Sequence, residues 1–232
     1  HAFTFKDNLT GKSLSIRPDI SEQASRIDAY RIQSDEVVRL CYSGEVVKSK
    51  ASKVLRSRTT IQAGAEIFGD SSSESELESI RLMLDSLDIA GIQDTTLSIG
   101  HAGFTAAVLE PFKQLELELF SKIEAAISKK SKSDLHSLIP ETFAHKKSLI
   151  TLCDMYGDKK ILDKAKDVFS YIDNVTEYLE NIDFIITELV KDRNLEIHID
   201  LGEIQGFKYH NGIVFSAYSG SAGYVLAKGG RY

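Results

Sequence analysis

Polar side chains at two places in the sequence are the first candidates for a binding site. Asp19 and Ser21 stand at the junction of a predicted strand and a predicted helix, where either could instead cap the helix by accepting a backbone N–H. Gln62 and Glu66 lie on one face of a second predicted strand, because alternate residues of a strand point to the same side. A carboxylate turned into a sheet is costly unless it is paired, so Glu66 either faces water or meets a ligand.

A basic segment joins the two strands predicted over residues 36–47 and 59–68. Its cationic side chains are Lys48, Lys50, Lys53, Arg56 and Arg58. A solvated hairpin loop accounts for this charge, and a surface for a phosphate group or for a partner is the sharper alternative.

The C-terminal part of the chain holds a third group of side chains. Gln205, Tyr209 and His210 fall within the segment 200–215, and Gly229-Gly230-Arg231-Tyr232 follows at the end. Taken singly, these residues are compatible with turns and aromatic core positions. No metal-ligand or redox spacing connects the scattered histidines and the two cysteines, which are His101, His136, His145, His198, Cys41 and Cys153. We therefore expect no metal site and no cofactor.

The composition is that of a soluble globular protein, with 232 residues, of which 42% are hydrophobic and 27% charged. The formal net charge of -6 argues against a general nucleic-acid binder, which usually carries a basic excess. No apolar run approaches the roughly 18 residues that cross a bilayer, and no secretory signal opens the chain. We expect a cytoplasmic protein that does not enter a membrane.

The elements that must position these side chains alternate between strands and helices over the first hundred residues. Strands are predicted over residues 13–17, 36–47, 59–68 and 95–99, and a helix over 20–32. A second helix is predicted to begin at a capping box formed by Ser73 and Glu76, because Leu77 and later apolar residues follow at helical spacing.

Residues 102–193 lose the strand signals. Tyr171, Val175, Tyr178, Ile182, Ile185 and Leu189 recur in steps of three and four, which predicts an amphipathic helix. Strands return over residues 195–201, 212–218 and 224–227. We expect an α+β fold, in which one antiparallel sheet is interrupted by a helical insertion. The predicted parts are a first core segment at 1–101, the insertion at 102–194 and the remainder of the core at 195–232.

In this order the segments resemble the catalytic domain of the histidyl-tRNA synthetases, which have the class II aminoacyl-tRNA synthetase fold. Arg17-Pro18-Asp19-Ile20-Ser21 stands where that family has Arg-Pro-Glu-Gly-Thr, and residues 42–69 cover its second class-defining motif. Residues 205–211 fall on the first histidine-specific motif, normally Arg-Gly-Leu-Asp-Tyr-Tyr-Asn, and residues 229–232 match the start of the second. An Asp would come next and the chain begins with His1, so we expect sequence to be missing at both ends.

Three departures from the family decide the expected activity. By the resemblance, Lys48 replaces an Arg that contacts the α-phosphate of ATP, and a lysine lacks the bidentate fork of a guanidinium. Lys50 replaces an acidic residue that reads the adenine, and Gln205 replaces an Arg over the reacting groups. One lost preorganised donor typically costs about 2.7–4 kcal/mol. We therefore expect no adenylation and no catalytic activity of the chain's own.

The resemblance also implies that the amino-acid pocket of the family is retained. The resemblance implies that Asp19, Ser21 and Gln62 hold the α-amino group of histidine. It also implies that Glu66, Tyr209 and His210 face the imidazole. A pocket kept while adenylation is lost is typical of the regulatory subunits of ATP phosphoribosyltransferase, which are paralogues of the synthetases.

This second resemblance implies a role in the first step of histidine biosynthesis. A subunit of this kind activates a short-form ATP phosphoribosyltransferase catalytic chain and carries the feedback signal of histidine, with no tRNA partner. It pairs as a dimer within a hetero-octamer of both chains. Two other classes stay open, namely a histidyl-tRNA synthetase catalytic domain and an unrelated binding module on the same fold.

Overall fold

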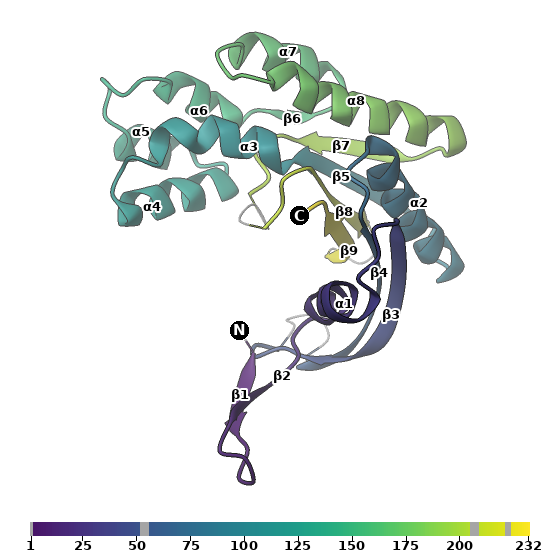
Figure 1. The fold of residues 1–232 in the computed structure, drawn as a ribbon. Coiled ribbons are helices and arrows are strands. Elements are labelled where there is room, and N and C mark those ends of the chain that lie inside the picture. Colours follow the sequence, from purple (N-terminus) through teal and green to yellow (C-terminus); the bar gives the residue numbers. More distant parts are fainter. Residues whose placement is uncertain (1, 52–55, 205–208, 221–223) are drawn as a thin grey trace. The chain divides into compact units, whose positions relative to one another are not determined.

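The computed structural model describes all residues except 1, 52–55, 205–208 and 221–223. The chain divides into two compact units, residues 1–70 (unit 1) and residues 71–232 (unit 2). Figure 1 shows the elements of both units, which are described separately below.

Unit 1 consists of two antiparallel hairpins and one short helix. Its elements are β1 (Phe3–Lys6), β2 (Ser13–Ile16), α1 (Ser21–Ile27), the π-helical turn η1 (Asp28–Ile32), β3 (Val38–Val47) and β4 (Thr59–Phe68). β1 pairs with β2, and β3 pairs with β4 along their whole length from Val38 opposite Phe68 to Val47 opposite Thr59. The long β3–β4 ribbon therefore has one face against which side chains of α1 and of the loop before it can pack.

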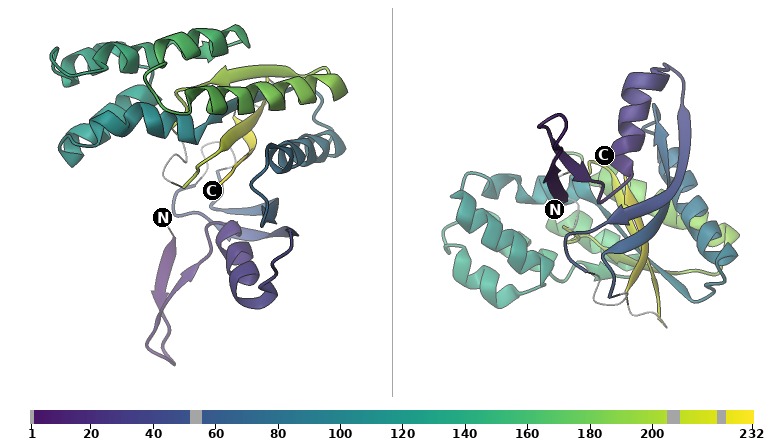
Figure 2. Two further views of the ribbon diagram at one scale, coloured as in Figure 1. Left: turned by 45° about the horizontal axis from the view of Figure 1, so that its top comes forward. Right: turned by 90° about the horizontal axis from the view of Figure 1, so that it is seen from below.

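Unit 2 places helices against a five-stranded sheet. Its elements are α2 (Ser73–Ile89), β5 (Thr95–His101), α3 (Ala102–Leu109), η2 (Glu110–Phe112), α4 (Leu117–Ser128), α5 (Lys132–Leu138), α6 (Lys146–Leu152), β6 (Tyr156–Gly157), α7 (Lys160–Val168), α8 (Val175–Asp192), β7 (Glu196–Asp200), β8 (Ile213–Ser219) and β9 (Val225–Gly230). The strand order is β6-β7-β5-β8-β9. The neighbours are antiparallel except β5 and β7, which run parallel. The helices α2 and α8 lie side by side against this sheet (Figures 1 and 2).

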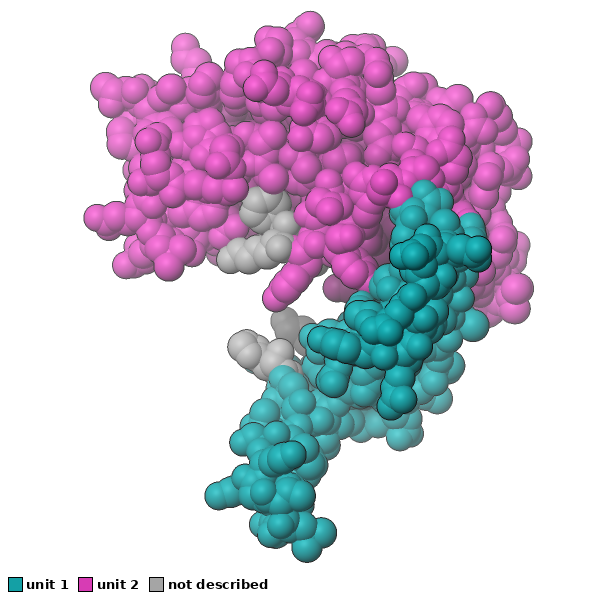
Figure 3. Space-filling model, viewed as in Figure 1, with its two compact units in different colours: residues 1–70 teal, residues 71–232 magenta. Residues whose placement is uncertain are grey.

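The hydrophobic core belongs to unit 2. Leu97 and Ile99 of β5 are buried beneath the helices, and the rings of Phe104 and Phe169 meet edge to face with their centroids 5.2 Å apart. Along α8, buried residues recur at helical spacing, namely Leu179, Ile182, Ile185, Ile186 and Leu189. Among the described residues of unit 1, by contrast, the buried apolar side chains are Ile20, Ala24 and Val46. The two units, teal and magenta in Figure 3, thus differ in how much apolar surface they bury by themselves.

Several predicted elements are confirmed. The strand β4 has the bounds that the sequence predicts, and the helices α2 and α8 and the strands β2, β3, β5, β7, β8 and β9 lie within a few residues of theirs. The helix predicted over 20–32 is divided into α1 and the π-helical turn η1. The α+β class is confirmed, with helices from α3 to α8 inserted between β5 and β7. The predicted boundaries at residues 101 and 194 remain predictions, and the division by contacts falls after Asp70. Within the described part of the chain, the structure contains no helix long and apolar enough to cross a bilayer.

Other predictions are wrong. The described strands form three sheets instead of one, and β5 runs parallel to β7. A two-residue strand, β6, occurs inside the helical block. The helix α2 is capped by Ser72, whose Oγ accepts the N–H of Ser75, because the carboxylate of Glu76 turns into the core instead of back to a cap. The helix α8 begins at Val175, so Tyr171 precedes it despite matching its period.

Candidate functional site

The β3–β4 register aligns the predicted ligand-binding residues on one face of unit 1. Gly44 stands opposite Gln62, Tyr42 opposite Gly64, and Leu40 opposite Glu66. Because strand side chains alternate, Tyr42, Gln62 and Glu66 share this face. The segment that leads into α1 contacts the same face, which brings Asp19 and Ser21 to the ribbon.

Asp19 and Gln62 form the first half of the site. The side-chain amide of Gln62 donates from Nε2 to Asp19 Oδ1 at 3.0 Å, and its Oε1 accepts the backbone N–H of Ile20 at 3.1 Å. Asp19 Oδ1 also accepts the backbone N–H of Ser21 at 2.9 Å. Gln62 therefore fixes both the carboxylate of Asp19 and the backbone beside it.

Tyr42 joins the second half of the site. Its hydroxyl donates to Glu66 Oε1 at 3.2 Å and lies 3.0 Å from the Oγ of Ser21, which then donates to it. The ring lies flat over Gly64, where an added Cβ would be 2.5 Å from the tyrosine oxygen. Only a residue without a side chain leaves room for this ring, so Gly64 is as necessary to the arrangement as Tyr42 itself.

The protonation states suit a ligand that carries hydrogen-bond donors. Burial acts to raise the pKa of the Asp19 carboxyl, but the hydrogen bonds from Ser21 and Gln62 outweigh it and hold that pKa below its ordinary value. Burial and the negative charges of Glu66 and Asp19 raise the pKa of Tyr42. At neutral pH Asp19 is therefore an anion and Tyr42 a donor. A carboxylate acceptor beside an oriented amide is the chemistry that binds an ammonium group.

The alternative role of Asp19 and Ser21 as helix caps is not what the structure shows. The N-cap residue of α1 is Ile20, and no side chain caps the helix. Asp19 instead accepts the N–H of Ser21 from two residues away, within its contact to Gln62. The side chain of Arg17 closes one end of the site, since its Nη2 lies against Gly44 while Nη1 donates to Gln23 Oε1 at 2.8 Å.

Two residues of this site, Tyr42 and Arg17, were not among those predicted to contact a ligand. No signal in the sequence identifies them, because what they share is a contact of each large side chain with a glycine, Tyr42 on Gly64 and Arg17 on Gly44. The strand register sets Tyr42 opposite Gly64, and the packing of the segment before α1 sets Arg17 against Gly44.

The described residues of the basic segment lie at the end of the β3–β4 hairpin, and a phosphate or partner surface there stays a prediction. The N–H of Lys48 donates to the carbonyl of Arg58 at 2.9 Å, which extends the β3–β4 ladder by one pair. Lys48 and Lys50 are exposed, and the Arg58 guanidinium lies 5.4 Å from the centroid of the Phe3 ring. Lys53 and Gln205 lie outside the described residues. The loss of adenylation through Lys48, Lys50 and Gln205 stays a prediction.

Tyr209 and His210 belong to unit 2. Tyr209 is 82% exposed, while His210 packs on Gly230, where an added Cβ would lie 2.6 Å from the His210 ring. His210 and Asn211 line an open cavity of about 600 Å³ together with α3 and Tyr178. Their contact with the same ligand as Asp19 and Glu66 remains a prediction.

The histidines and cysteines that the structure describes form no metal site. Among the described residues no group of three His, Cys, Asp or Glu side chains could hold a metal ion. Cys153 is buried, and burial raises the pKa of its thiol. Cys41 is exposed on β3, because β3 buries the opposite, even-numbered face.

His101 is a buried structural histidine with a consequence for pH. It is 3% exposed, and its Nδ1 accepts the backbone N–H of Phe104 at 3.2 Å, which caps α3. Burial and, to a smaller extent, the charge of Arg231 lower the pKa of His101 from 6.5 to about 4. The folded protein therefore holds this imidazole neutral at a pH where the unfolded chain protonates it.

We expect His101 to destabilise the fold as the medium is acidified. The stability that comes from the lowered pKa of His101 is fully present above pH 6.5 and is lost as the pH falls toward 4. At pH 5 the free energy of unfolding should be about 2 kcal/mol lower for this reason. His101→Asn retains an acceptor for the cap but does not titrate, so its stability should fall less steeply. Urea unfolding at pH 7, 6 and 5 measures the difference. Parallel pH profiles for the two proteins would contradict the assignment.

Comparisons with known proteins agree with this architecture. A family model described as histidyl-tRNA synthetase matches residues 1–232. The chain is 36% identical to the ATP phosphoribosyltransferase regulatory subunit of Teredinibacter turnerae over 237 residues, which cover 99% of this chain and 59% of that protein. It is 35% identical to the subunit of the same name from Burkholderia lata, covering 99% and 60%. The chain thus spans about three-fifths of the length of these curated relatives.

Solved structures show the same fold. A protein from Bacillus halodurans titled ATP phosphoribosyltransferase regulatory subunit/histidyl-tRNA synthetase superposes with a TM-score of 0.84 at 24% identity, covering 100% of this chain and 60% of that chain. An ATP phosphoribosyl transferase complex from Thermotoga maritima gives a TM-score of 0.73 at 19% identity, covering 99% and 80%. The class II synthetase fold expected from the sequence is confirmed.

Proposed function

Because the chain belongs to the histidyl-tRNA synthetase family, we propose that it acts as the regulatory subunit of a short-form ATP phosphoribosyltransferase and not as a synthetase. The observation that carries this proposal is an acceptor site of the expected residue types in a chain whose adenylation positions are altered. Asp19 and Glu66 are held by neutral donors from Gln62 and Tyr42, as a histidine pocket requires. Lys48, Lys50 and Gln205 stand where adenylation needs other residue types.

In this role the chain has no catalytic activity of its own. It binds the catalytic chain in the cytoplasm, raises its activity in the first step of histidine biosynthesis, and transmits inhibition when histidine occupies the pocket. The names of the relatives from Teredinibacter turnerae and Burkholderia lata support this reading over a synthetase. Neither a cofactor nor tRNA takes part.

Self-association is the second part of the proposal. Unit 1 buries few apolar residues, while Phe5, Leu14 and Ile16 of its first hairpin and Tyr30 of η1 are exposed. A two-stranded ribbon is only marginally stable alone in water. Contact with another protein surface would bury these exposed apolar side chains. We propose that two copies pair and that the pairs join the catalytic chains in a hetero-octamer.

Co-expression with a short catalytic chain tests the proposed function. We expect a stable complex whose phosphoribosyl-ATP formation is faster than that of the catalytic chain alone and falls as histidine is added. The isolated subunit, with ATP, magnesium and histidine, should show no pyrophosphate exchange above background. Robust exchange that disappears when Lys48 is changed would favour a synthetase, and absence of any complex would favour an unrelated binding module.

A further inference from the structure

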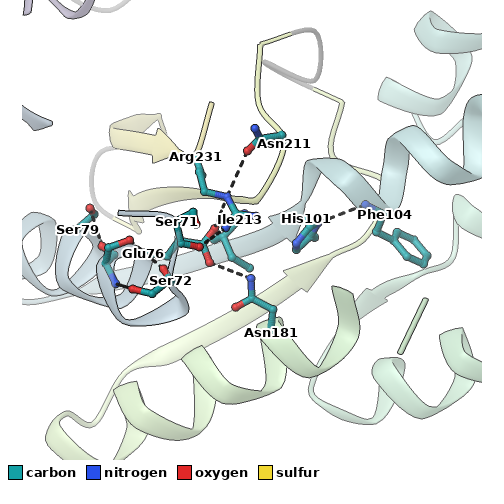
Figure 4. A network of polar contacts seen from close by, with 11 residues as sticks. Ser71, Ser72, Glu76, Ser79, His101, Phe104, Asn181, Asn211, Ile213 and Arg231 are labelled. Carbon is teal, nitrogen blue, oxygen red and sulfur yellow. Dashed lines mark hydrogen bonds and ion pairs between the residues drawn. The ribbon is translucent and has the colours of Figure 1, made fainter. Parts of the chain in front are cut away.

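We infer that Glu76 is a positioning residue for the loop 209–212, which it holds in place for ligand binding without touching the ligand. The inference rests on the proposed function, because Tyr209 and His210 matter only if that loop contacts histidine. Figure 4 shows the contacts around Glu76, all of them within unit 2.

Glu76 is a buried carboxylate whose partners lie at the end of the loop, directly after β9 and in α8. Only 5% of the residue is exposed. Its Oε1 accepts the backbone N–H of Ile213 at 3.0 Å and lies 3.3 Å from Arg231 Nε, and its Oε2 accepts Nδ2 of Asn181 at 2.8 Å. A buried charge is tolerated when it is paired and fully hydrogen-bonded, and these three partners meet that condition.

Arg231 extends the network to both sides of the loop. Its Nη1 donates to the carbonyl of Ser71 at 2.7 Å, and its Nε donates to Asn211 Oδ1 at 3.2 Å. Its backbone accepts the N–H of Asn211 at 2.9 Å and donates to the carbonyl of Ile213 at 3.0 Å. The backbone of Arg231 therefore ties the loop to the end of β9, and its side chain, whose charge Glu76 balances, ties the loop to the segment before α2.

Two glycines let the loop approach this network closely. A Cβ on Gly212 would overlap Arg231 and Glu76, and a Cβ on Gly230 would lie 2.6 Å from His210 Cδ2. The carbonyl of Gly212 also accepts the N–H of Ala102 at 2.8 Å. His210 thus packs against Gly230 of β9, and Glu76 and Arg231 hold the backbone of residues 211–213 that follows it.

Glu76 itself does not line the cavity that His210, Asn211 and Tyr178 share. Any effect of Glu76 on ligand affinity is therefore indirect, and we assign it to the loop that Glu76 holds. If a looser loop lowers the fraction of molecules in the binding conformation, the apparent affinity for the ligand falls in proportion to that fraction.

The test compares Glu76→Gln with Glu74→Gln in the complex with the catalytic chain. Glutamine keeps the shape, and Asn181 can turn its amide so that its buried, unpartnered Oδ1 accepts from the new side chain. The counter-charge of Arg231 is lost. Glu74 lies exposed on the same helix and is the matched control. Asn181→Ala, which removes a single contact to Glu76, serves if Glu76→Gln fails to fold.

Titration calorimetry should show histidine affinity weakened roughly three- to tenfold by Glu76→Gln, with the Glu74→Gln value unchanged. Amide hydrogen exchange without histidine should show faster exchange at Ile213 in the Glu76 variant only. The inference is overturned if Glu76→Gln binds histidine as tightly as the wild type. Unchanged exchange at Ile213 would then mean that Glu76 does not hold the loop, and faster exchange would mean that Glu76 is a purely structural residue. A wild-type complex that binds no histidine refutes the proposed function instead, while its exchange data still report on the loop.

Discussion

Replacing Asp19 by Ala should make the assembled phosphoribosyltransferase much less sensitive to histidine while its stimulated activity stays largely intact. Asp19 is held as an anion by Gln62 and by the Ser21 N–H, so the variant removes the acceptor proposed for the α-amino group. A hydrogen bond to a charged group contributes about 1.5–3 kcal/mol, which corresponds to a loss of roughly tenfold or more in affinity. Phosphoribosyl-ATP formation across a histidine titration, with wild-type and variant subunits, measures the change.

Glu66→Gln provides an independent variant of the same pocket. It keeps the shape and can still accept the Tyr42 hydroxyl, but it loses the charge proposed to meet the imidazole. Histidine affinity should weaken by at least roughly tenfold. An unchanged inhibition curve in both variants would place the feedback site outside this pocket. Loss of activation together with inhibition would show instead that Asp19 supports folding or assembly.

Coupling between the two chains has a reciprocal consequence for the Asp19 experiment. If histidine inhibits through this chain, it binds the active and inhibited states with different affinity, and bound substrates must change histidine affinity by the same factor. Calorimetry of the wild-type complex with and without substrates therefore checks the regulation separately from the pocket. Identical histidine affinity in both conditions would rule out coupling.

Leu84→Ala should be the more damaging of two leucine substitutions in α2. Leu84 is 2% exposed in the core beneath the helix, and truncation of such a side chain costs about 2–5 kcal/mol through lost burial and the cavity left behind. Leu82 lies two residues away, is 48% exposed, and its replacement by Ala should cost less than about 0.5 kcal/mol. Urea unfolding of the two variants against the wild type measures the difference.

Comparing Leu82→Ala with Leu84→Ala tests directly whether Leu84 lies in the core. Both variants remove the same atoms from the same helix, so helix propensity contributes equally and the difference reports burial alone. Similar free energies of unfolding for Leu82→Ala and Leu84→Ala would mean that α2 does not pack on the sheet as described.

Local pattern alone determined much of the chain. The alternation of β4 and the three-and-four spacing of α8 predicted both elements, because a strand or helix with one buried face must repeat apolar residues at its own period. The same alternation placed Gln62 and Glu66 on one face, and the structure confirms it. The motifs around Asp19 and residues 229–232 were enough for the family, since their order along the chain is itself specific.

Only the tertiary structure decided which elements meet. Periodicity reports that a face is buried but not what covers it, so the parallel pairing of β5 with β7 across the helical insertion was not predictable from either strand. Tyr42 joined the site because the register sets it over Gly64. Glu76 had the spacing of a capping residue, yet the N–H groups of Ile213 and Asn181 draw its carboxylate inward. When a side chain could accept from either a local or a distant donor, the tertiary structure decides which bond forms. Buried distant donors must be paired, because an unpaired buried polar group is costly.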